Sequence, residues 1–347
     1  MNTYTDIILK HLKALLSIDS PTGYTREVTD YLIKEYQALG YQPQKTVKGG
    51  VLVDLGGRDA ENAVFLEAHV DTLGAMVREI KANGRLSLTP LGGMNANNAE
   101  AENCRIITRS GKVYEGTCQL CDASVHVNGK YDETGRTFDT VEVLPDEKVT
   151  TKEDTQALGI MTGDIVAFDP RTTITNSGYI KSRFLDDKLS AAILLGYAAY
   201  LKEENIVTER KLYQHFTVYE EVGHGGAASI PQGVTEVLSV DMGCVGEGLE
   251  CKEYQVSICA KDSGGPYTYD LVSSLIEAAR KENLDFAVDV YPHYGSDAEA
   301  ALRAGYDVRH GLIGAGVYAS HGYERSHIDG VKKHLFTVKS LFGIDTF

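Results

Sequence analysis

The chain has 347 residues, 43% of them hydrophobic and 24% charged, which is the composition of a globular protein with one large domain or two. Its formal net charge of -15 argues against a nucleic-acid partner and against an anionic membrane surface, because both require a basic face. No apolar run approaches the ~20 residues of a membrane span.

Residues 1–20 predict a helix, because apolar residues from Ile7 to Leu16 recur at the spacing of one helical face. Lys10 and Lys13 interrupt this run, and no small-residue cleavage site follows it. We therefore expect no signal peptide and a cytoplasmic location.

A second helix is predicted at 25–40 and ends at Gly40, and two short apolar strands follow at 50–57 and 63–71. From about residue 75 to 175 the pattern changes to many short strand-like pieces broken by Gly, Asn, Asp and Pro. The only helical pattern there is a short one at 152–159. This stretch predicts a β-rich module inserted between two parts of another domain.

From residue 186 onward, helices and strands alternate, which predicts a mostly parallel sheet covered by helices. Helices are expected at 186–204, 269–283, 297–305 and 326–343, and strands at 212–219, 237–241, 286–291 and 307–314. The expected fold class is thus α/β, a mixed and mostly parallel sheet with an inserted β-rich domain. We assign 1–72 and 174–347 to the α/β domain and 73–173 to the insert.

Six cysteines are scattered along the chain, and Cys118 and Cys121 form a lone C-x-x-C. No second pair follows at zinc-ribbon spacing, so reduced thiols are the simpler interpretation for a cytoplasmic protein.

Polar residues gather where predicted strands end and where a predicted helix starts. In open α/β sheets, functional groups collect at the carboxyl ends of strands. The residues at these positions are His69, Asp71, Asp186, Glu220, Glu221, Asp241 and His321.

Two histidines and several carboxylates suit divalent ions such as zinc, cobalt or manganese. One ion would need only three of these ligands. The surplus therefore predicts two ions that share a bridging carboxylate, about 3.5–4 Å apart.

Six segments of the chain, in this order, resemble the M42 family of dinuclear metallo-aminopeptidases over essentially the full length. The segments are "AHVDT", "FLDDK", "YEEVGHGGA", "LSVDMG", "GSDAEAA" and "YASHGYE". The resemblance implies a zinc-exopeptidase-like α/β domain with a small β-barrel-like insert. It also implies an enzyme that removes N-terminal residues from short peptides.

The resemblance also implies a role for each candidate residue. His69 and Asp241 would hold one metal ion, Glu221 and His321 the other, and Asp186 would bridge both. Asp71 would hydrogen-bond His69 and fix its tautomer. Glu220 would bind no metal and would act as the general base on the attacking water.

The cofactors implied are two divalent ions per subunit, zinc first, with cobalt or manganese as alternatives. The partners implied are short peptides and further copies of the chain, in a dodecamer built from dimers through the insert.

Two departures from the family pattern stand out: His224-Gly225 replaces a common Leu-Arg, and Ser296 replaces a common Thr. The first of these puts the family's substrate preference in doubt for this chain.

Three other functions remain open at the level of sequence. A deacylase or amidase could use the same two-metal site on small N-acyl metabolites. A glycoside hydrolase would need two carboxyls about 5–9.5 Å apart and no metal. A non-catalytic peptide-binding module is the third, and retention of both the ligand set and Glu220 speaks against it.

Overall fold

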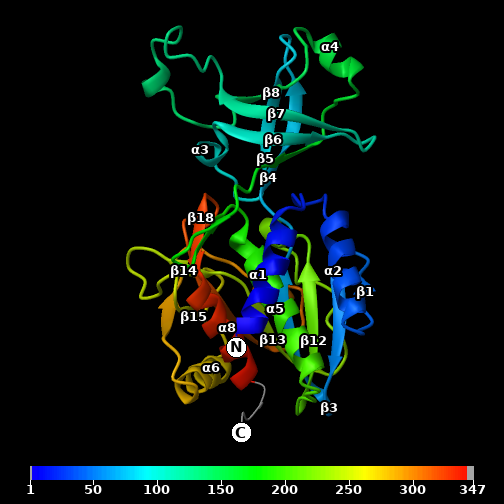
Figure 1. Cartoon of the computed structure of the whole chain (residues 1–347), viewed down its shortest axis with the longest axis vertical. Coiled ribbons are helices and arrows are strands. Elements are labelled where there is room, and N and C mark those ends of the chain that lie inside the picture. The colour runs from blue at the N-terminus through cyan, green and yellow to red at the C-terminus, as the bar shows by residue number, and fades with distance from the viewer. Residues whose placement is uncertain (1, 342–347) are drawn as a thin grey trace.

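In this computed structural model, the chain forms a layered α/β domain and a closed β-barrel. Figure 1 shows the barrel above the α/β domain. The structure describes residues 2–341, and the side chains of residues 4–335. No helix among these residues is long and apolar enough to cross a membrane.

The α/β domain is built on a twelve-stranded mixed sheet. Nine strands follow one another across it in the order β1 (Gln44–Lys45), β2 (Val51–Gly56), β12 (Arg210–Thr217), β3 (Asp59–His69), β13 (Val234–Val240), β17 (Arg309–Tyr318), β18 (Glu324–His327), β11 (Tyr179–Ser182) and β10 (Thr173–Ile174). Of the other three, β14 (Gly243–Val245) and β15 (Val256–Lys261) pair with β17, and β16 (Phe286–Val290) pairs with β15.

The four central strands β12, β3, β13 and β17 run parallel. The carboxyl-terminal half of β3 is continuously buried, as expected for a parallel strand covered on both faces. Thr217 pairs with His69, and Ser239 pairs with Glu67, so β12, β3 and β13 end at nearly the same level, whereas β17 continues beyond them to Tyr318. This register brings together the residues that follow each strand.

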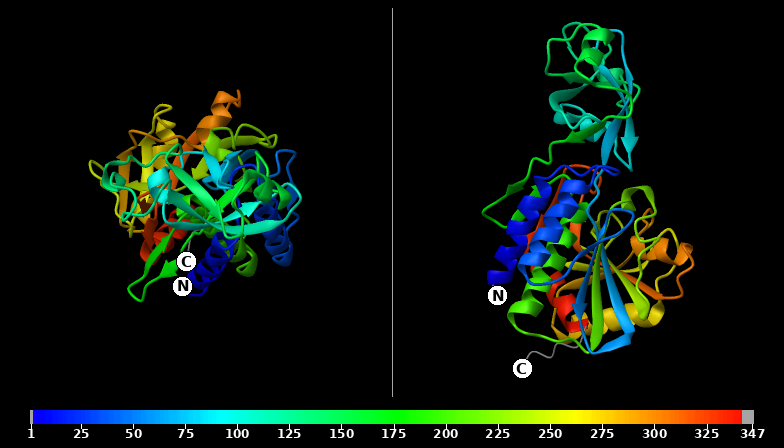
Figure 2. Two further views of the ribbon diagram at one scale, coloured as in Figure 1. Left: turned by 90° about the horizontal axis from the view of Figure 1, so that it is seen from above. Right: turned by 90° about the vertical axis from the view of Figure 1, so that its right-hand side faces the viewer.

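Helices cover both faces of the sheet, with α1, α2 and α5 on one side and α7 on the other (Figure 2). Helix α5 is buried along nearly its whole length and packs against α1 and β3. The helices of this domain are α1 (Asn2–Leu16), α2 (Arg26–Ala38), α5 (Leu185–Glu203), α6 (Tyr269–Lys281), α7 (Asp297–Arg303) and α8 (Ile328–Leu341), and a 3₁₀ turn η2 spans Glu220–Val222.

The barrel consists of six antiparallel strands that lie between β3 and β10 in the chain. Their order around the barrel is β4 (Gly74–Ile80), β5 (Leu86–Leu91), β8 (Val141–Pro145), β7 (Val113–Leu120), β6 (Glu102–Ile107) and β9 (Ile165–Phe168). Short helices α3 (Ala96–Ala99) and α4 (Lys152–Ala157) and a 3₁₀ turn η1 (Tyr131–Glu133) lie in its connections. Closing the sheet on itself leaves the barrel no exposed edge strand.

The expected fold class is confirmed, an α/β fold with a mixed sheet and an inserted barrel. Besides the four central strands, β14 pairs with β17 and β15 pairs with β16 in parallel, and the remaining pairs of this sheet are antiparallel. The expected helix at 326–343 starts too early, because residues up to His327 form β18, which pairs with β11, and the helix begins at Ile328. Phe342 and Gly343 lie outside the described residues.

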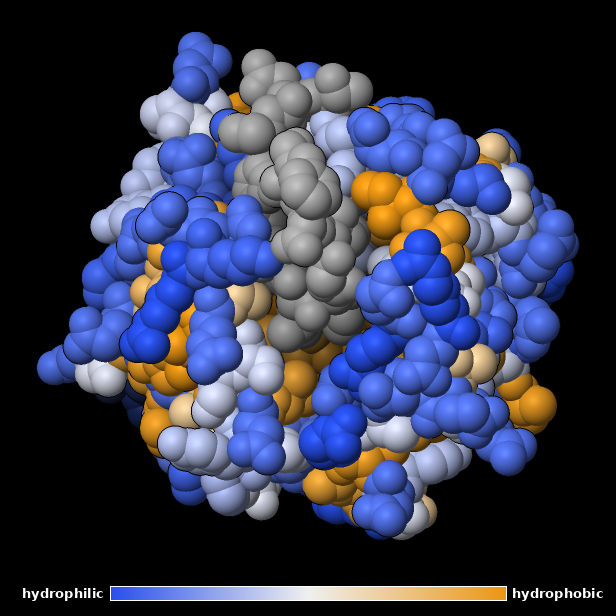
Figure 3. Space-filling model, turned by 90° about the horizontal axis from the view of Figure 1, so that it is seen from below, coloured by the Kyte–Doolittle hydropathy of each residue, from blue (hydrophilic) through white to orange (hydrophobic). Residues whose placement is uncertain are grey.

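The end of the molecule opposite the barrel is largely hydrophilic, with hydrophobic residues in small separate groups (Figure 3). The six cysteines are all free, and Cys104, Cys118, Cys251 and Cys259 are buried.

Candidate metal centre and active site

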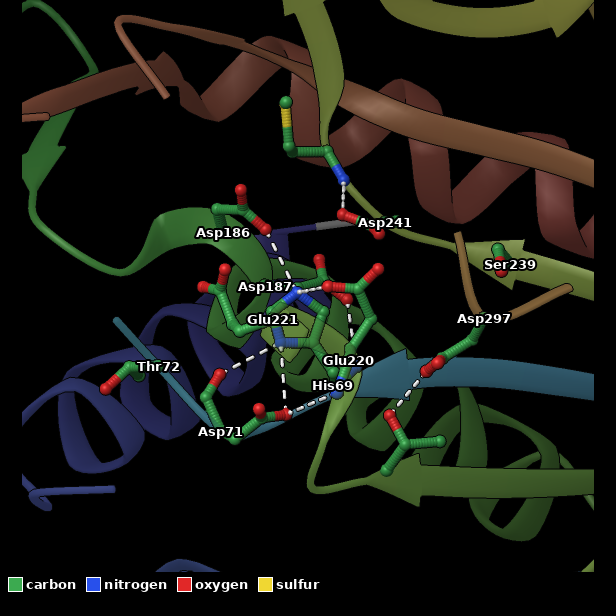
Figure 4. Close-up of polar contacts among 12 residues, drawn as sticks. His69, Asp71, Thr72, Asp186, Asp187, Glu220, Glu221, Ser239, Asp241 and Asp297 are labelled. Atoms are coloured by element: carbon green, nitrogen blue, oxygen red, sulfur yellow. Dashed lines mark hydrogen bonds and ion pairs between the residues drawn. The ribbon is translucent and has the colours of Figure 1, made fainter. Parts of the chain in front are cut away.

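The seven residues singled out in the sequence lie close together at the carboxyl edge of the central strands. Figure 4 shows His69 at the centre, with Asp71, Asp186, Glu220, Glu221 and Asp241 around it. His69 ends β3, Asp241 follows β13, Glu220 and Glu221 form the 3₁₀ turn after β12, and His321 follows β17. The aligned ends of β12, β3 and β13 explain why the first four converge, and His321 comes from the loop between β17 and β18.

Asp186 contacts both histidines. Its Oδ1 lies 3.0 Å from Nε2 of His69, and its Oδ2 lies 3.5 Å from Nε2 of His321. Nε2 of His321 is also 3.6 Å from Oε2 of Glu221. One carboxylate therefore faces two imidazoles, one at the end of β3 and one in the loop after β17.

Asp241 and Asp187 form a second grouping with His69. One ligand atom from each of His69, Asp187 and Asp241 falls within 4.8 Å of the others, and the same is true of His69, Asp186 and Glu221. Asp187 accepts the backbone N–H of His69 through Oδ2 at 3.2 Å, whereas its Oδ1 is buried with no hydrogen-bond partner. The peptide bond between Asp186 and Asp187 is cis.

Asp71 supports His69 in a different way from the one expected. Nδ1 of His69 lies 2.9 Å from the backbone oxygen of Asp71 and 3.6 Å from its carboxylate. The carboxylate instead accepts the backbone N–H of Glu220 at 3.2 Å and the hydroxyl of Thr22 at 2.7 Å. Asp71 thus orients His69 with its main chain and the Glu220 turn with its side chain.

The acidic residues of the centre destabilise one another's charged forms. Burial, and then the charge of Asp186, raises the pKa of Asp241 to about 7. Burial raises the pKa of Glu220 and Glu221 well above their usual range, with neighbouring carboxylates adding to the effect. Burial also opposes charge on Asp186, but hydrogen bonds from His321 and His69 lower its pKa below the ordinary value. A nearby positive charge would stabilise the ionised forms of these buried carboxylates.

The donor atoms present suit that need. Imidazole nitrogen and carboxylate oxygen are the ligands that zinc and similar divalent ions take in proteins. The two groupings around His69 are the only sets of three or more such residues with this spacing among residues 2–341. The unpartnered Oδ1 of Asp187 adds a further acceptor that the protein itself leaves unsatisfied.

The segment after the two glutamates is anchored by Asp297. Its carboxylate accepts the backbone N–H of Gly226 at 2.6 Å and the hydroxyl of Thr217. A Cβ at Gly225 or Gly226 would overlap Asp297, so glycine is required where "EEVGHGGA" turns past this carboxylate. His224 lies exposed on the same segment, with its ring stacked on Tyr219 at 5.1 Å between centroids.

Sequence reasoning missed two residues that hold the centre together. Glu324, which is buried, accepts the backbone N–H groups of Asp186 and His321, each at 3.1 Å. Thr22 comes from the loop before α2 and hydrogen-bonds Asp71. Glu324 lies in the quoted motif "YASHGYE" and could have been suspected, whereas nothing in the sequence around Thr22 marks it.

The centre opens into a cavity of ≈ 610 Å³. Asp186, Glu220, Glu221, Asp241 and His321 line one part of it, and Met242, Cys244, His293, Tyr294 and Arg303 are among the residues that line the rest. The acidic cluster therefore lines a cavity large enough for a small molecule.

A family model and a curated relative that match this chain both carry the description aminopeptidase. The family model described as M42 glutamyl aminopeptidase matches residues 49–335. The "Putative aminopeptidase YhfE" of Bacillus subtilis (strain 168) is 47% identical over 321 residues, which cover 91% of each chain.

Two solved structures share the fold at low sequence identity. An aminopeptidase from the archaeon Desulfurococcus kamchatkensis has a TM-score of 0.86 at 20% identity and covers 98% of this chain and 95% of its own. The Pyrococcus horikoshii TET1 peptidase, described as assembling into a tetrahedron or a large octahedral shell, has a TM-score of 0.84 at 21% identity. That match covers 96% of this chain and 99% of the other.

Proposed function

This chain belongs to the M42 glutamyl aminopeptidase family, and from that premise we propose a role for each residue of the acidic centre in removing N-terminal residues from short peptides. The chain is an aminopeptidase, a hydrolase that acts on peptide bonds. What the family leaves open is how these particular side chains divide the work.

We assign His69 and Asp241 to one divalent ion and Glu221 and His321 to a second, with Asp186 bridging the two. The bridging role is supported by the contacts of Asp186 with both histidines, at 3.0 and 3.5 Å. Asp187 falls in the grouping with His69 and Asp241 but not in the one with Glu221, and its Oδ2 accepts the backbone N–H of His69, so we place it outside the bridge. When bound, two such ions supply Lewis-acid polarisation of the scissile carbonyl and lower the pKa of an attacking water.

Glu220 is the general base in this proposal. It accepts a proton from the attacking water and returns it to the leaving amine, so the base is regenerated when the peptide bond has broken. The observation that carries the assignment is the contrast within the pair. The side chain of Glu220 is 16% exposed and that of Glu221 only 3%; although Glu220 lies 3.6 Å from Nε2 of His69, only Glu221 belongs to a grouping of ligand atoms.

Asp71 holds Glu220 in place through the backbone N–H at 3.2 Å and orients His69 through its main-chain oxygen. We therefore treat Asp71 as a positioning residue rather than as a proton carrier. Asp297 fixes the far end of the same turn.

Zinc is the proposed metal, because the set mixes imidazole with carboxylate, and cobalt or manganese would fit the same donors. We propose the cytoplasm as the location, since six free cysteines are typical of a reducing compartment. We further propose 1–72 and 174–347 as the catalytic domain and 73–173 as the module for subunit contacts.

Activity is expected on peptides with a free N-terminal amine. Aminoacyl anilides should be hydrolysed in the presence of zinc, cobalt or manganese, and N-acyl amino acids should not. The measurement is the kcat/KM ratio for matched pairs with the same side chain. A preference for the N-acyl partner would instead identify a deacylase that uses the same centre.

The full-length chain is expected to form a homo-oligomer, with twelve copies as the assembly and a dimer as its building block. Light scattering coupled to size exclusion would give the mass. The assembling relative of similar fold supports this expectation. A mass of one chain at micromolar concentration would contradict it.

A further inference from the structure

A segment of the inserted barrel packs against the proposed metal centre. Residues 92–98 follow β5 and lie against Glu221 and His321. A Cβ added at Gly93 would lie 2.5 Å from Nδ1 of His321, and one at Gly92 would lie 3.1 Å from Cβ of Glu221. Only residues without side chains allow the barrel segment to come this close.

Asn98 makes a side-chain polar contact with the His321 loop. Its Nδ2 donates to the backbone oxygen of His321 at 2.9 Å. The side chain is half-buried and lies in the short helix α3, whose start is held by Asn95. A Cβ at Gly322, the next residue after His321, would lie 3.3 Å from the same Nδ2. The amide is therefore packed directly against the His321 loop.

The main chain of Asn98 contacts the segment that leads to Asp186. Its backbone oxygen accepts Nη2 of Arg183 at 2.6 Å, and Arg183 is also paired with Glu102 of β6. Both Arg183 and Glu102 are buried. Since Arg183 precedes Asp186 by three residues, Asn98 ties the segment that carries the bridging carboxylate to the loop that carries His321.

His321 needs such support more than the other proposed ligands. Its φ is +62°, the left-handed conformation that a residue with a Cβ rarely adopts without tertiary contacts. Its side chain is 41% exposed, whereas that of His69 is 1% exposed. Two contacts hold its backbone, Glu324 on the N–H and Asn98 on the oxygen.

We propose that Asn98 of the inserted barrel is a positioning residue for His321, so that the insert completes the metal centre of its own chain. The inference rests on the proposed function, because it takes His321 as a ligand of the second ion. Replacing a residue that hydrogen-bonds to a metal ligand and orients it typically weakens metal affinity by about 10–100-fold.

The test is a cobalt(II) titration of the metal-free, full-length protein, followed by visible absorption and calorimetry. Asn98→Ala removes the amide donor and leaves the backbone contact with Arg183 intact. We expect one of the two ions to bind about 10-fold more weakly or worse, with the other unchanged. Asn98→Asp, which places an acceptor against the His321 oxygen, should weaken that ion further.

Asn97→Ala is the matched control, because Asn97 is exposed on the same short helix and its side chain makes none of these contacts. His321→Ala should lose the same ion that Asn98→Ala weakens. Melting of the metal-free variants separates a general loss of stability from a loss of ligand placement, since only the first would lower the melting temperature without metal.

Wild-type affinity for both ions in Asn98→Ala and Asn98→Asp, with one ion lost in His321→Ala, would overturn the inference and leave the proposed function standing. Two ions still bound tightly in His321→Ala would contradict both. A weakened ion in the Asn98 variants that is restored at high cobalt, with unchanged melting of the metal-free protein, is the result that supports it.

Discussion

Glu220→Gln is expected to lower kcat by about 10²–10⁴-fold, the usual contribution of a general base, while both ions remain bound. Glutamine keeps the shape of the side chain and can still hydrogen-bond, but it does not accept the proton of the attacking water. The contact between the Glu220 backbone and Asp71 is unaffected by the change, so the turn should keep its place. Steady-state kinetics and metal analysis on the same preparation provide the measurement.

Glu221→Gln is the matched control, since it makes the same chemical change one residue away. Glu221 is the member of the pair that contacts His321, at 3.6 Å, so its replacement should weaken metal binding rather than proton transfer. Part of the lost activity should return at high metal concentration. If Glu220→Gln empties the centre and Glu221→Gln leaves it full, the two roles are reversed. If neither change affects rate or metal content, the mechanism is wrong.

Removing the metal with a chelator is expected to abolish hydrolysis, and adding back zinc, cobalt or manganese should restore it. The reason is that, in the proposed function, the bound ions would supply both the polarisation of the scissile carbonyl and the lowered pKa of the attacking water. Two ions per chain should be found by elemental analysis. His69→Ala should reduce the content sharply, because His69 belongs to both groupings of ligand atoms.

Full activity in a preparation without metal would exclude the two-metal reading and would reopen a metal-free mechanism such as that of glycoside hydrolases. The matched control for His69→Ala is His224→Ala. That imidazole is exposed and stacked on Tyr219, so its loss should leave the metal content unchanged.

The order of elements and the identity of the chemical groups could be read from the sequence. Alternation of helices and strands after residue 186 indicates a sheet with parallel strands, and the carboxyl ends of such strands share one edge. That rule is local and general, so His69, Glu221 and Asp241 could be expected near one another without coordinates. The dense turns between 75 and 175 likewise indicated a separate β-rich part.

What the sequence did not reveal depends on contacts between segments that are far apart in the chain. The main-chain oxygen of Asp71, rather than its carboxylate, meets His69, because backbone direction after β3 decides which atom faces the ring. Glu324 bridges Asp186 and His321 only once the sheet register has set both loops side by side.

Asn98 is the clearest example of a contact that the sequence does not reveal. It is separated from His321 by 223 positions, and no periodicity or spacing links the two. Their contact exists because the barrel docks on the α/β domain through Arg183 and Glu102, and two glycines allow the close approach. Local patterns report which residues belong to a strand end, whereas the docking of one folded part on another is decided by packing between whole surfaces.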